Sequence, residues 1–319
     1  MRSFATLFVF LFLSLSAFGF ADCHCCSNVD VGFGWRRDNI KWNAHLRDCF
    51  IGVSHIDSNL FFKHVDIYTV NAKAKTMSCA YYLRGSAEYG QTYKGRLVED
   101  FEFTNSLFPI SNISTQVRNP IRRRCEVYDF SAAAGYPLSF GGCCACQGYI
   151  VPLIGYSFHR QYMRVKEHHP VFSRLAPFDA AFFGLDRIRE SVLLGCSCPC
   201  VDICKRLWSH YRFTWYGPFI GVDLAYALDG CWTLFAELEA HYGKCHRKRK
   251  SQTSIKKLDD LHRVSRSYGF EGKIGTAFYL GNCWYADLAV NFTWWKSYQS
   301  SQYTQWDSIG IKANLGYTF

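Results

Sequence analysis

The end of the chain alternates strictly between apolar and polar residues. One face carries Ile309, Ile311, Ala313, Leu315, Tyr317 and Phe319, and the other carries Ser308, Gly310, Lys312, Asn314 and Gly316. A period of two predicts a β-strand, and an apolar outer face opposite a polar inner face is typical of a membrane barrel. We expect the aromatic residues Tyr317 and Phe319 to act as the membrane-insertion signal of such a barrel.

The same period recurs in two upstream segments, residues 232–242 and 284–294. The apolar face of each begins and ends on an aromatic residue, as the girdles at the two membrane surfaces require. Weaker strand signals lie at 29–36, 65–76, 80–94, 126–138, 149–165, 212–226 and 268–280. Together with the C-terminal segment they predict an all-β fold: a transmembrane, antiparallel, up-and-down β-barrel of about ten strands.

The segments between the predicted strands alternate in length. Short connections fall at 77–79, 139–148, 227–231 and 281–283, and long ones at 37–64, 95–125, 166–211, 243–267 and 295–307. Bacterial barrels have short periplasmic turns and long outer loops. We therefore expect the short connections and both termini to face the periplasm.

The N-terminus has the pattern of a signal peptide. Arg2 precedes the apolar run 4–18, and Gly19 and Ala21 place small residues at a cleavage site. We expect a cleaved signal peptide over 1–21 and an integral outer-membrane barrel domain over 22–319. A retained helical anchor is the alternative. After residue 21 no window is apolar for 18 residues, so the sequence predicts no helical span.

All 16 cysteines follow the predicted signal peptide, and an exported chain meets an oxidising compartment, so disulfides are expected. The predicted topology places nine at the periplasmic face: Cys23, Cys25, Cys26, Cys79, Cys143, Cys144, Cys146, Cys231 and Cys283. It places seven at the outer face: Cys49, Cys125, Cys196, Cys198, Cys200, Cys204 and Cys245. A disulfide cannot cross a bilayer of about 30 Å, and both numbers are odd. Each face therefore keeps at least one thiol that is free or joined to another molecule, unless the protein is an ordinary barrel with internal loop disulfides and one miscounted face.

The segment 196–204, CSCPCVDIC, crowds four thiols that in principle suit a zinc ion. Its spacing is not that of a zinc ribbon or finger, and the loop is predicted to be extracellular. Disulfides are therefore the favoured interpretation, and we expect no metal and no cofactor.

Four stretches resemble one known family: VGFGWRRDNIKWN (31–43), RRRCEVYDFSAAAGYPLSF (122–140), PLIGYSFHRQYMRVK (152–166) and WYGPFIGVDLAYALDGCWTLFAELEAHY (215–242). They are similar to the Protochlamydia-type outer-membrane proteins, cysteine-containing barrels of chlamydia-related bacteria. The resemblance implies an omptin-like architecture of ten strands. It also implies an envelope held together by disulfides between cysteine-rich proteins, so other such proteins are the expected partners.

By alternation, seven charged or titratable residues point into the barrel, where they are expected to pair across strands: Asp223, Glu237, Glu239, His241, Glu271, Lys273 and Lys312. An omptin-type protease would instead use two carboxylates and an acid/His pair, for which Asp100, Glu102, Glu239 and His241 are candidates. Two of these acids are Glu where that family uses Asp, and His241 falls within a strand. We therefore expect no enzyme.

A barrel of ten strands is close to the size at which side chains fill the interior. A structural or surface role is thus favoured over a narrow, porin-like channel, which is the alternative.

The formal net charge of +10 is concentrated in one predicted outer loop with Lys244, Arg247, Lys248, Arg249 and Lys250. Such a run attracts polyanions. The expected partners are outer-membrane lipid, the phosphates of lipopolysaccharide and sulfated glycans of a host cell. The location disfavours nucleic acid, so we expect none as a partner. A solvated loop without a partner is the alternative.

Overall fold

The computed structural model describes residues 26–50, 53–105, 113–121, 124–140, 148–167, 207–228, 231–251, 261–281, 283–299 and 302–319. Every regular element in these ranges is a β-strand. The strands are β1 (Cys26–Phe50), β2 (Val53–Met77), β3 (Tyr82–Asn105), β4 (Ile113–Pro120), β5 (Glu126–Gly135), β6 (Leu138–Phe140), β7 (Gly148–Glu167), β8 (Leu207–Ala227), β9 (Trp232–Ser251), β10 (Leu261–Gly281), β11 (Trp284–Gln299) and β12 (Gln302–Thr318). Within the described ranges there is no helix of the length and apolarity that a membrane crossing needs.

The strands close into one antiparallel barrel of ten strands, as the alternation predicts. Each strand pairs with its neighbours in the chain, and β1 closes the ring by pairing with β12. β4 and β5 both pair with β3, β4 with its second half and β5 with its first, so they form one interrupted strand of the ring. The short β6 pairs with β7 in the same register as β5, so it continues this interrupted strand of the ring.

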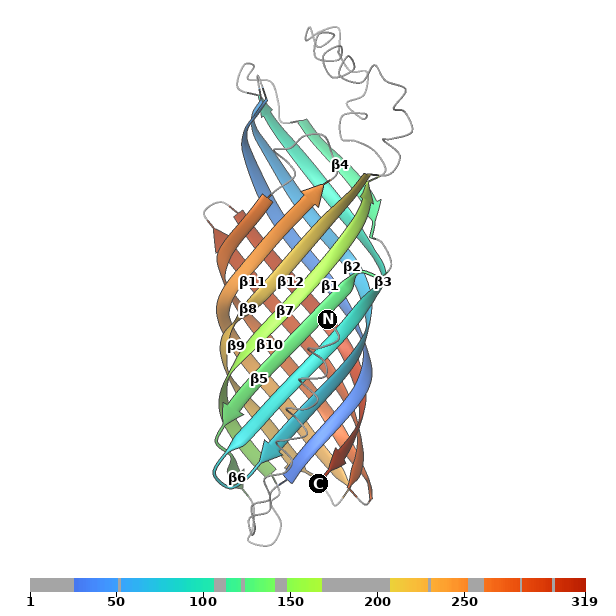
Figure 1. The fold of residues 1–319 in the computed structure, drawn as a ribbon, viewed down its shortest axis with the longest axis vertical. Coiled ribbons are helices and arrows are strands. Elements are labelled where there is room, and N and C mark those ends of the chain that lie inside the picture. Colours follow the sequence, from blue (N-terminus) through green and yellow to red (C-terminus); the bar gives the residue numbers. More distant parts are fainter. Residues whose placement is uncertain are drawn as a thin grey trace, which may run out of the picture.

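The two ends of the barrel differ. At one end, here called the terminal end, the backbone of Phe319 bonds to Ser27 and the β2–β3, β8–β9 and β10–β11 turns lie (Figure 1, bottom). At the opposite end, here called the distal end, β1 to β4 rise above the other strands (Figure 1, top). The predicted signal peptide, residues 1–21, lies outside the described residues.

The half of the barrel near the terminal end has the surface of a membrane protein. On β12, Ile309, Ile311 and Leu315 are 56%, 49% and 47% exposed, whereas Asn314 is 5% exposed. Aromatic pairs lie near both margins of the apolar band, for example Trp284 with Tyr317 at 5.1 Å between ring centroids. The expected apolar-out, polar-in arrangement is therefore present in this half.

The strands continue far beyond the predicted boundaries, so most of the predicted long loops are wrong. The predicted loop 37–64 consists of the ends of β1 and β2, with only residues 51–52 between them. The predicted loops 243–267 and 295–307 are likewise mostly strand. The reason is that the pattern is inverted in these segments: apolar side chains point into the barrel and polar ones point outward. On β1, Ile40 and Trp42 point inward and are buried, whereas Arg37 is on the outer side, paired with Asp66 at 2.8 Å.

The inverted half encloses an apolar core inside the barrel. The core contains four tryptophans, Trp42, Trp215, Trp295 and Trp306, each at most 1% exposed. Rings from opposite strands meet edge to face, as with Trp42 and Phe213 at 5.8 Å between centroids. A barrel whose inside is apolar and whose outside is charged is suited to water rather than lipid. The distal half therefore projects beyond the bilayer and its lumen is filled.

Candidate functional site

Below the apolar core, the lumen holds a network of buried ion pairs centred on Arg84 of β3. The Arg84 guanidinium donates to Asp223 Oδ1 at 2.6 Å and to Glu237 at 3.4 Å, and it also pairs with Glu239. Lys75 adds a bond to Glu237 at 3.0 Å. Arg84 is 4% exposed, so these carboxylates neutralise a cation that is shielded from water.

A second group of charges surrounds Arg36 of β1. This guanidinium lies 3.2 Å from both Asp38 and Glu88 and also pairs with Asp129. Lys312 of β12 pairs with Glu88 from the other side. The two networks join side chains of β1, β2, β3, β5, β8, β9 and β12, and opposite charges satisfy each other across the lumen.

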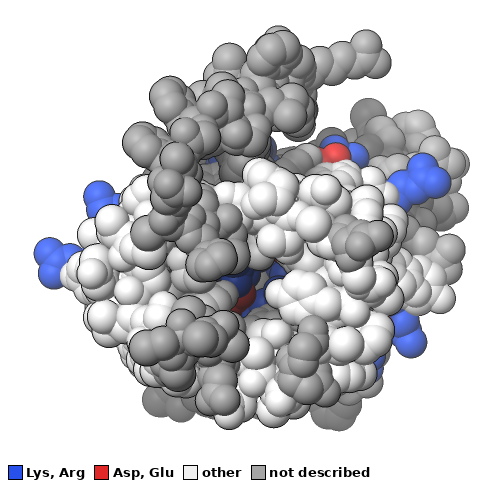
Figure 2. Space-filling model, turned by 90° about the horizontal axis from the view of Figure 1, so that it is seen from below, with Lys and Arg blue, Asp and Glu red and all other residues white. Residues whose placement is uncertain are grey.

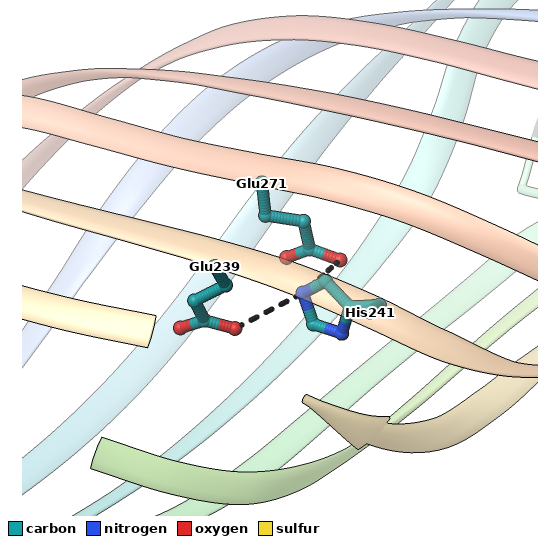
Figure 3. Close-up of side chains that lie close together, drawn as sticks. All are labelled: Glu239, His241 and Glu271. Atoms are coloured by element: carbon teal, nitrogen blue, oxygen red, sulfur yellow. Dashed lines mark ion pairs between the residues drawn. The ribbon is translucent and has the colours of Figure 1, made fainter. Parts of the chain in front are cut away.

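Between the Arg84 network and the tryptophan core, two histidines and two glutamates converge. Figure 3 shows three of them, Glu239, His241 and Glu271. The Nε2 atom of His241 lies 3.2 Å from Glu239 Oε2 and 3.8 Å from Glu271 Oε1. The Nε2 atom of His159, on β7, lies 3.0 Å from the same Glu271 oxygen. One ligand atom each from Glu239, His241 and Glu271 falls within 4.8 Å of the others, a grouping suited to a metal ion.

Neighbouring groups orient these side chains. His159 Nδ1 lies 3.2 Å from Asp129, and His241 Nδ1 lies 3.0 Å from the Ser157 hydroxyl. Trp295 donates its indole N–H to Glu271 at 3.0 Å. In each imidazole one nitrogen is held by a partner, so the other points toward the glutamates.

The structure therefore places all seven predicted lumen residues. It brings Asp223, Glu237 and Glu239 together around Arg84 and places His241 beside Glu271. Lys273 lies with its ammonium 5.0 Å from the Phe235 ring centre, and Lys312 pairs with Glu88 in the other network.

Comparison with known families gives one assignment. Residues 30–319 match the family described as Protochlamydia outer membrane protein. The chain belongs to this family. It is therefore an outer-membrane β-barrel protein, which confirms the resemblance seen in the sequence. A search of curated proteins found no match.

One solved structure shares the fold of this family member, and two others are less similar. The outer membrane protease OmpT from Escherichia coli aligns with a TM-score of 0.58 at 12% identity, over 92% of this chain and 97% of that chain. OprG from Pseudomonas aeruginosa aligns with a TM-score of 0.32 at 8% identity, over 92% and 95%. Ail from Yersinia pestis, in complex with the heparin analogue sucrose octasulfate, aligns with a TM-score of 0.28 at 8% identity, over 92% and 99%. Only the first reaches the level of a shared fold.

The predicted protease-like acids do not meet the acid/His pair. Glu239 contacts Arg84, near the start of β3, whereas Asp100 lies sixteen residues further along the same strand. At about 3.3 Å per residue this is a separation of about 50 Å along the strand. An arginine side chain does not span that length, so Asp100 and Glu102 belong to a different region from Glu239 and His241.

The described cysteines fall into two groups. Cys79, Cys231 and Cys283 are exposed on turns at the terminal end, where the topology predicts them. Cys125 and Cys245 are buried, and Cys245 belongs to the apolar core. Neither lies in an exposed outer loop, because Cys245 belongs to β9 and Cys125 is buried in the break between β4 and β5. Of the remaining candidates, Cys26 and Cys49 lie within β1, and Cys23, Cys25, Cys143, Cys144, Cys146, Cys196, Cys198, Cys200 and Cys204 lie outside the described residues.

The basic segment predicted as a polyanion-binding loop is also strand. Lys244, Arg247, Lys248, Arg249 and Lys250 all lie on β9. Alternation turns Arg247 and Arg249 inward, where Arg247 is fully buried and donates to Thr304 at 3.0 Å and Arg249 contacts Glu99 at 3.1 Å. Only Lys244, Lys248 and Lys250 remain on the outer side. The exposed basic surface is thus smaller than the sequence suggests.

Arg36 and His159 are central to the site but are absent from the predicted set. Both stand at inward positions of predicted strands, 29–36 and 149–165, so the alternation contained the signal. Alternation shows that a residue points inward, but it does not show which residue it meets.

Proposed function

We propose that this outer-membrane barrel is a structural component of the bacterial surface. In this role its closed barrel serves as a rigid anchor, and cysteines at its terminal end link it to other envelope proteins. The observation that supports this role best is the filled lumen. Four tryptophans and neighbouring apolar side chains occupy the distal half, and buried ion pairs occupy the half below.

A narrow channel is the second candidate. Seen from the terminal end, the molecule is hollowed at its centre, with basic and acidic side chains at the bottom of the hollow (Figure 2). A charged vestibule of this kind suits a solute path. The apolar core above it opposes conduction, because ions do not cross a packed apolar layer without a large desolvation cost.

Conductance in a planar bilayer distinguishes these roles. The protein refolded in detergent, with folding checked by its gel mobility before and after boiling, is expected to give no stable conductance steps. The double variant Trp42→Ala, Phe213→Ala removes two rings that meet in the core and is expected to raise conductance. A control variant, Tyr156→Ala, removes an exposed ring from the outer side of β7 and is expected to leave conductance unchanged. Stable steps in the parent protein would favour the channel.

A surface protease finds less support than either role, because Asp100 and Glu102 are remote from the acid/His pair. Binding of lipopolysaccharide or host sulfated glycans rests on the outward Lys244, Lys248 and Lys250 of β9. This is a smaller basic surface than a loop exposing all five predicted cations would provide.

A further inference from the structure

The four converging side chains of β7, β9 and β10 have the composition of a transition-metal site. Imidazole nitrogen and carboxylate oxygen together suit zinc and its neighbours in the first transition row, whereas calcium and magnesium prefer oxygen alone. Here two imidazoles and two carboxylates provide one ligand atom each: His159 Nε2, His241 Nε2, Glu239 Oε2 and Glu271 Oε1.

The spacing of three of the four ligand atoms, those of Glu239, His241 and Glu271, fits a tetrahedral ion. Zinc binds nitrogen and oxygen at about 2.0–2.2 Å, so neighbouring ligands of a tetrahedral site lie about 3.3 Å apart. The observed separations are 3.0 Å for His159 to Glu271, 3.2 Å for His241 to Glu239 and 3.8 Å for His241 to Glu271. Glu239, His241 and Glu271 thus need only small shifts to surround an ion, because their ligand atoms all lie within 4.8 Å of one another. His159 contacts Glu271 alone among them and must move closer to become the fourth ligand.

Both histidine Nε2 atoms are buried and aimed at the glutamates. His159 and His241 are 5% and 4% exposed, and His159 Nε2 faces Glu271 at 3.0 Å. Within the described part of the chain the His241 Nε2 atom makes no hydrogen bond. The Nδ1 atoms of the two histidines contact Asp129 and Ser157. A carboxylate that holds the far nitrogen of a ligating histidine is the usual support of a zinc site.

The charges also favour a cation. Glu239 and Glu271 stand directly opposite each other on β9 and β10, and like charges at such a pair repel. Arg84 binds Oε1 of Glu239 and leaves Oε2 for the site. A divalent ion with two carboxylates and two neutral imidazoles would form a neutral unit in a buried position.

We propose that His159, Glu239, His241 and Glu271 form a binding site for one divalent transition-metal ion, with zinc the preferred ion. The ion would tie β7 to β9 and β10 across the lumen, immediately below the tryptophan core. Its role is structural: it would stabilise the middle of the barrel.

Cobalt serves as a spectroscopic probe for this site. The full chain is refolded in detergent with EDTA, its accessible thiols are alkylated, and Co²⁺ is titrated. We expect one Co²⁺ per chain with the visible absorption of a four-coordinate ion, without thiolate charge-transfer bands, and displacement by Zn²⁺. Zinc is also expected to raise the unfolding temperature of the barrel.

Variants locate the site. Glu271→Gln and His159→Gln are each expected to weaken Co²⁺ binding at least a hundredfold and to abolish the zinc-dependent rise in unfolding temperature. Asp129→Asn, which acts through His159, is expected to weaken binding 10- to 100-fold. His246→Gln is the matched control, because this histidine lies on β9 but contacts Tyr216 on the outer side. Its affinity is expected to be that of the parent.

Glu271→Gln preserves the side-chain shape, so it tests the site even where a histidine variant does not fold. The proposal is overturned if the parent binds no Co²⁺. It is also overturned if the four-coordinate absorption persists unchanged in folded Glu271→Gln, since the ion would then lie elsewhere, for example on cysteine.

Discussion

At the scale of single residues, Arg84 is the buried cation whose removal tests how much the lumen ion pairs stabilise the barrel. It contacts three carboxylates, of Asp223, Glu237 and Glu239, at a position that is 4% exposed. Arg84→Ala removes the cation that these three acids share, while Glu237 and Asp223 keep a lysine partner, Lys75. We expect the free energy of unfolding to fall by about 3–5 kcal/mol, the usual loss when one partner of a buried ion pair is removed. Urea unfolding of the detergent-folded barrel measures this change in the free energy of unfolding.

The matched control at this scale is Arg212→Ala. Arg212 lies on β8 with its side chain exposed on the outer side of the barrel. An exposed charge contributes little, so the change is expected to stay within about 0.5 kcal/mol. Equal losses in the two variants would contradict a stabilising role of the Arg84 network.

At the scale of elements, one strand serves two environments. On β12 the outward Ile311 is 49% exposed within the apolar band, whereas the outward Gln305, six residues closer to the distal end, donates to Asp307 at 2.8 Å. Ile311→Arg is expected to destabilise the barrel in lipid vesicles by about 2–4 kcal/mol, the cost of a cation on the lipid face near mid-membrane.

Gln305→Arg introduces the same cation on the outer side of the half that faces water, and the new side chain still reaches Asp307. We expect a change within about 1 kcal/mol. The two variants are compared by equilibrium unfolding in vesicles of the same lipid. If both were equally destabilised, the apolar band would extend to Gln305 and the boundary between the two halves would be misplaced.

At the scale of the whole molecule, three exposed cysteines lie at the same end of the barrel: Cys79, Cys231 and Cys283. Cys231 and Cys283 cannot bond to each other as placed. The Cys231 carbonyl accepts from Tyr279 of β10, and Tyr279 pairs with Tyr285 of β11. The two turns are thus two strand spacings apart, about 10 Å, whereas a disulfide needs Cα atoms within about 7 Å.

We therefore expect disulfides from this end to other envelope proteins. Envelopes prepared in alkylating buffer are expected to show the protein in high-mass bands without reductant and as a monomer with dithiothreitol. Changing Cys231 and Cys283 to Ser is expected to reduce these bands, whereas the buried Cys245→Ser leaves them unchanged. A monomer on the non-reducing gel of the parent would contradict the linking role.

The sequence alone determined the class of the protein and the membrane half of the barrel. Alternation identifies a lipid-facing strand wherever one face is apolar and the other polar, as at 232–242, 284–294 and 309–319, and ten such segments predict the ring. The turns and the exposed cysteines at Cys79, Cys231 and Cys283 follow from the same pattern.

Only the tertiary structure decided where the strands end and which side chains meet. In the distal half the strands keep a period of two, but here the apolar face points into the lumen and the polar face points outward. Trp42 and Cys245 are therefore core residues in segments that sequence analysis predicts as loops. The cluster of His159, His241, Glu239 and Glu271 comes from three strands that closure of the barrel brings together. No spacing along the chain encodes that meeting, because it depends on the tilt and register of the whole ring.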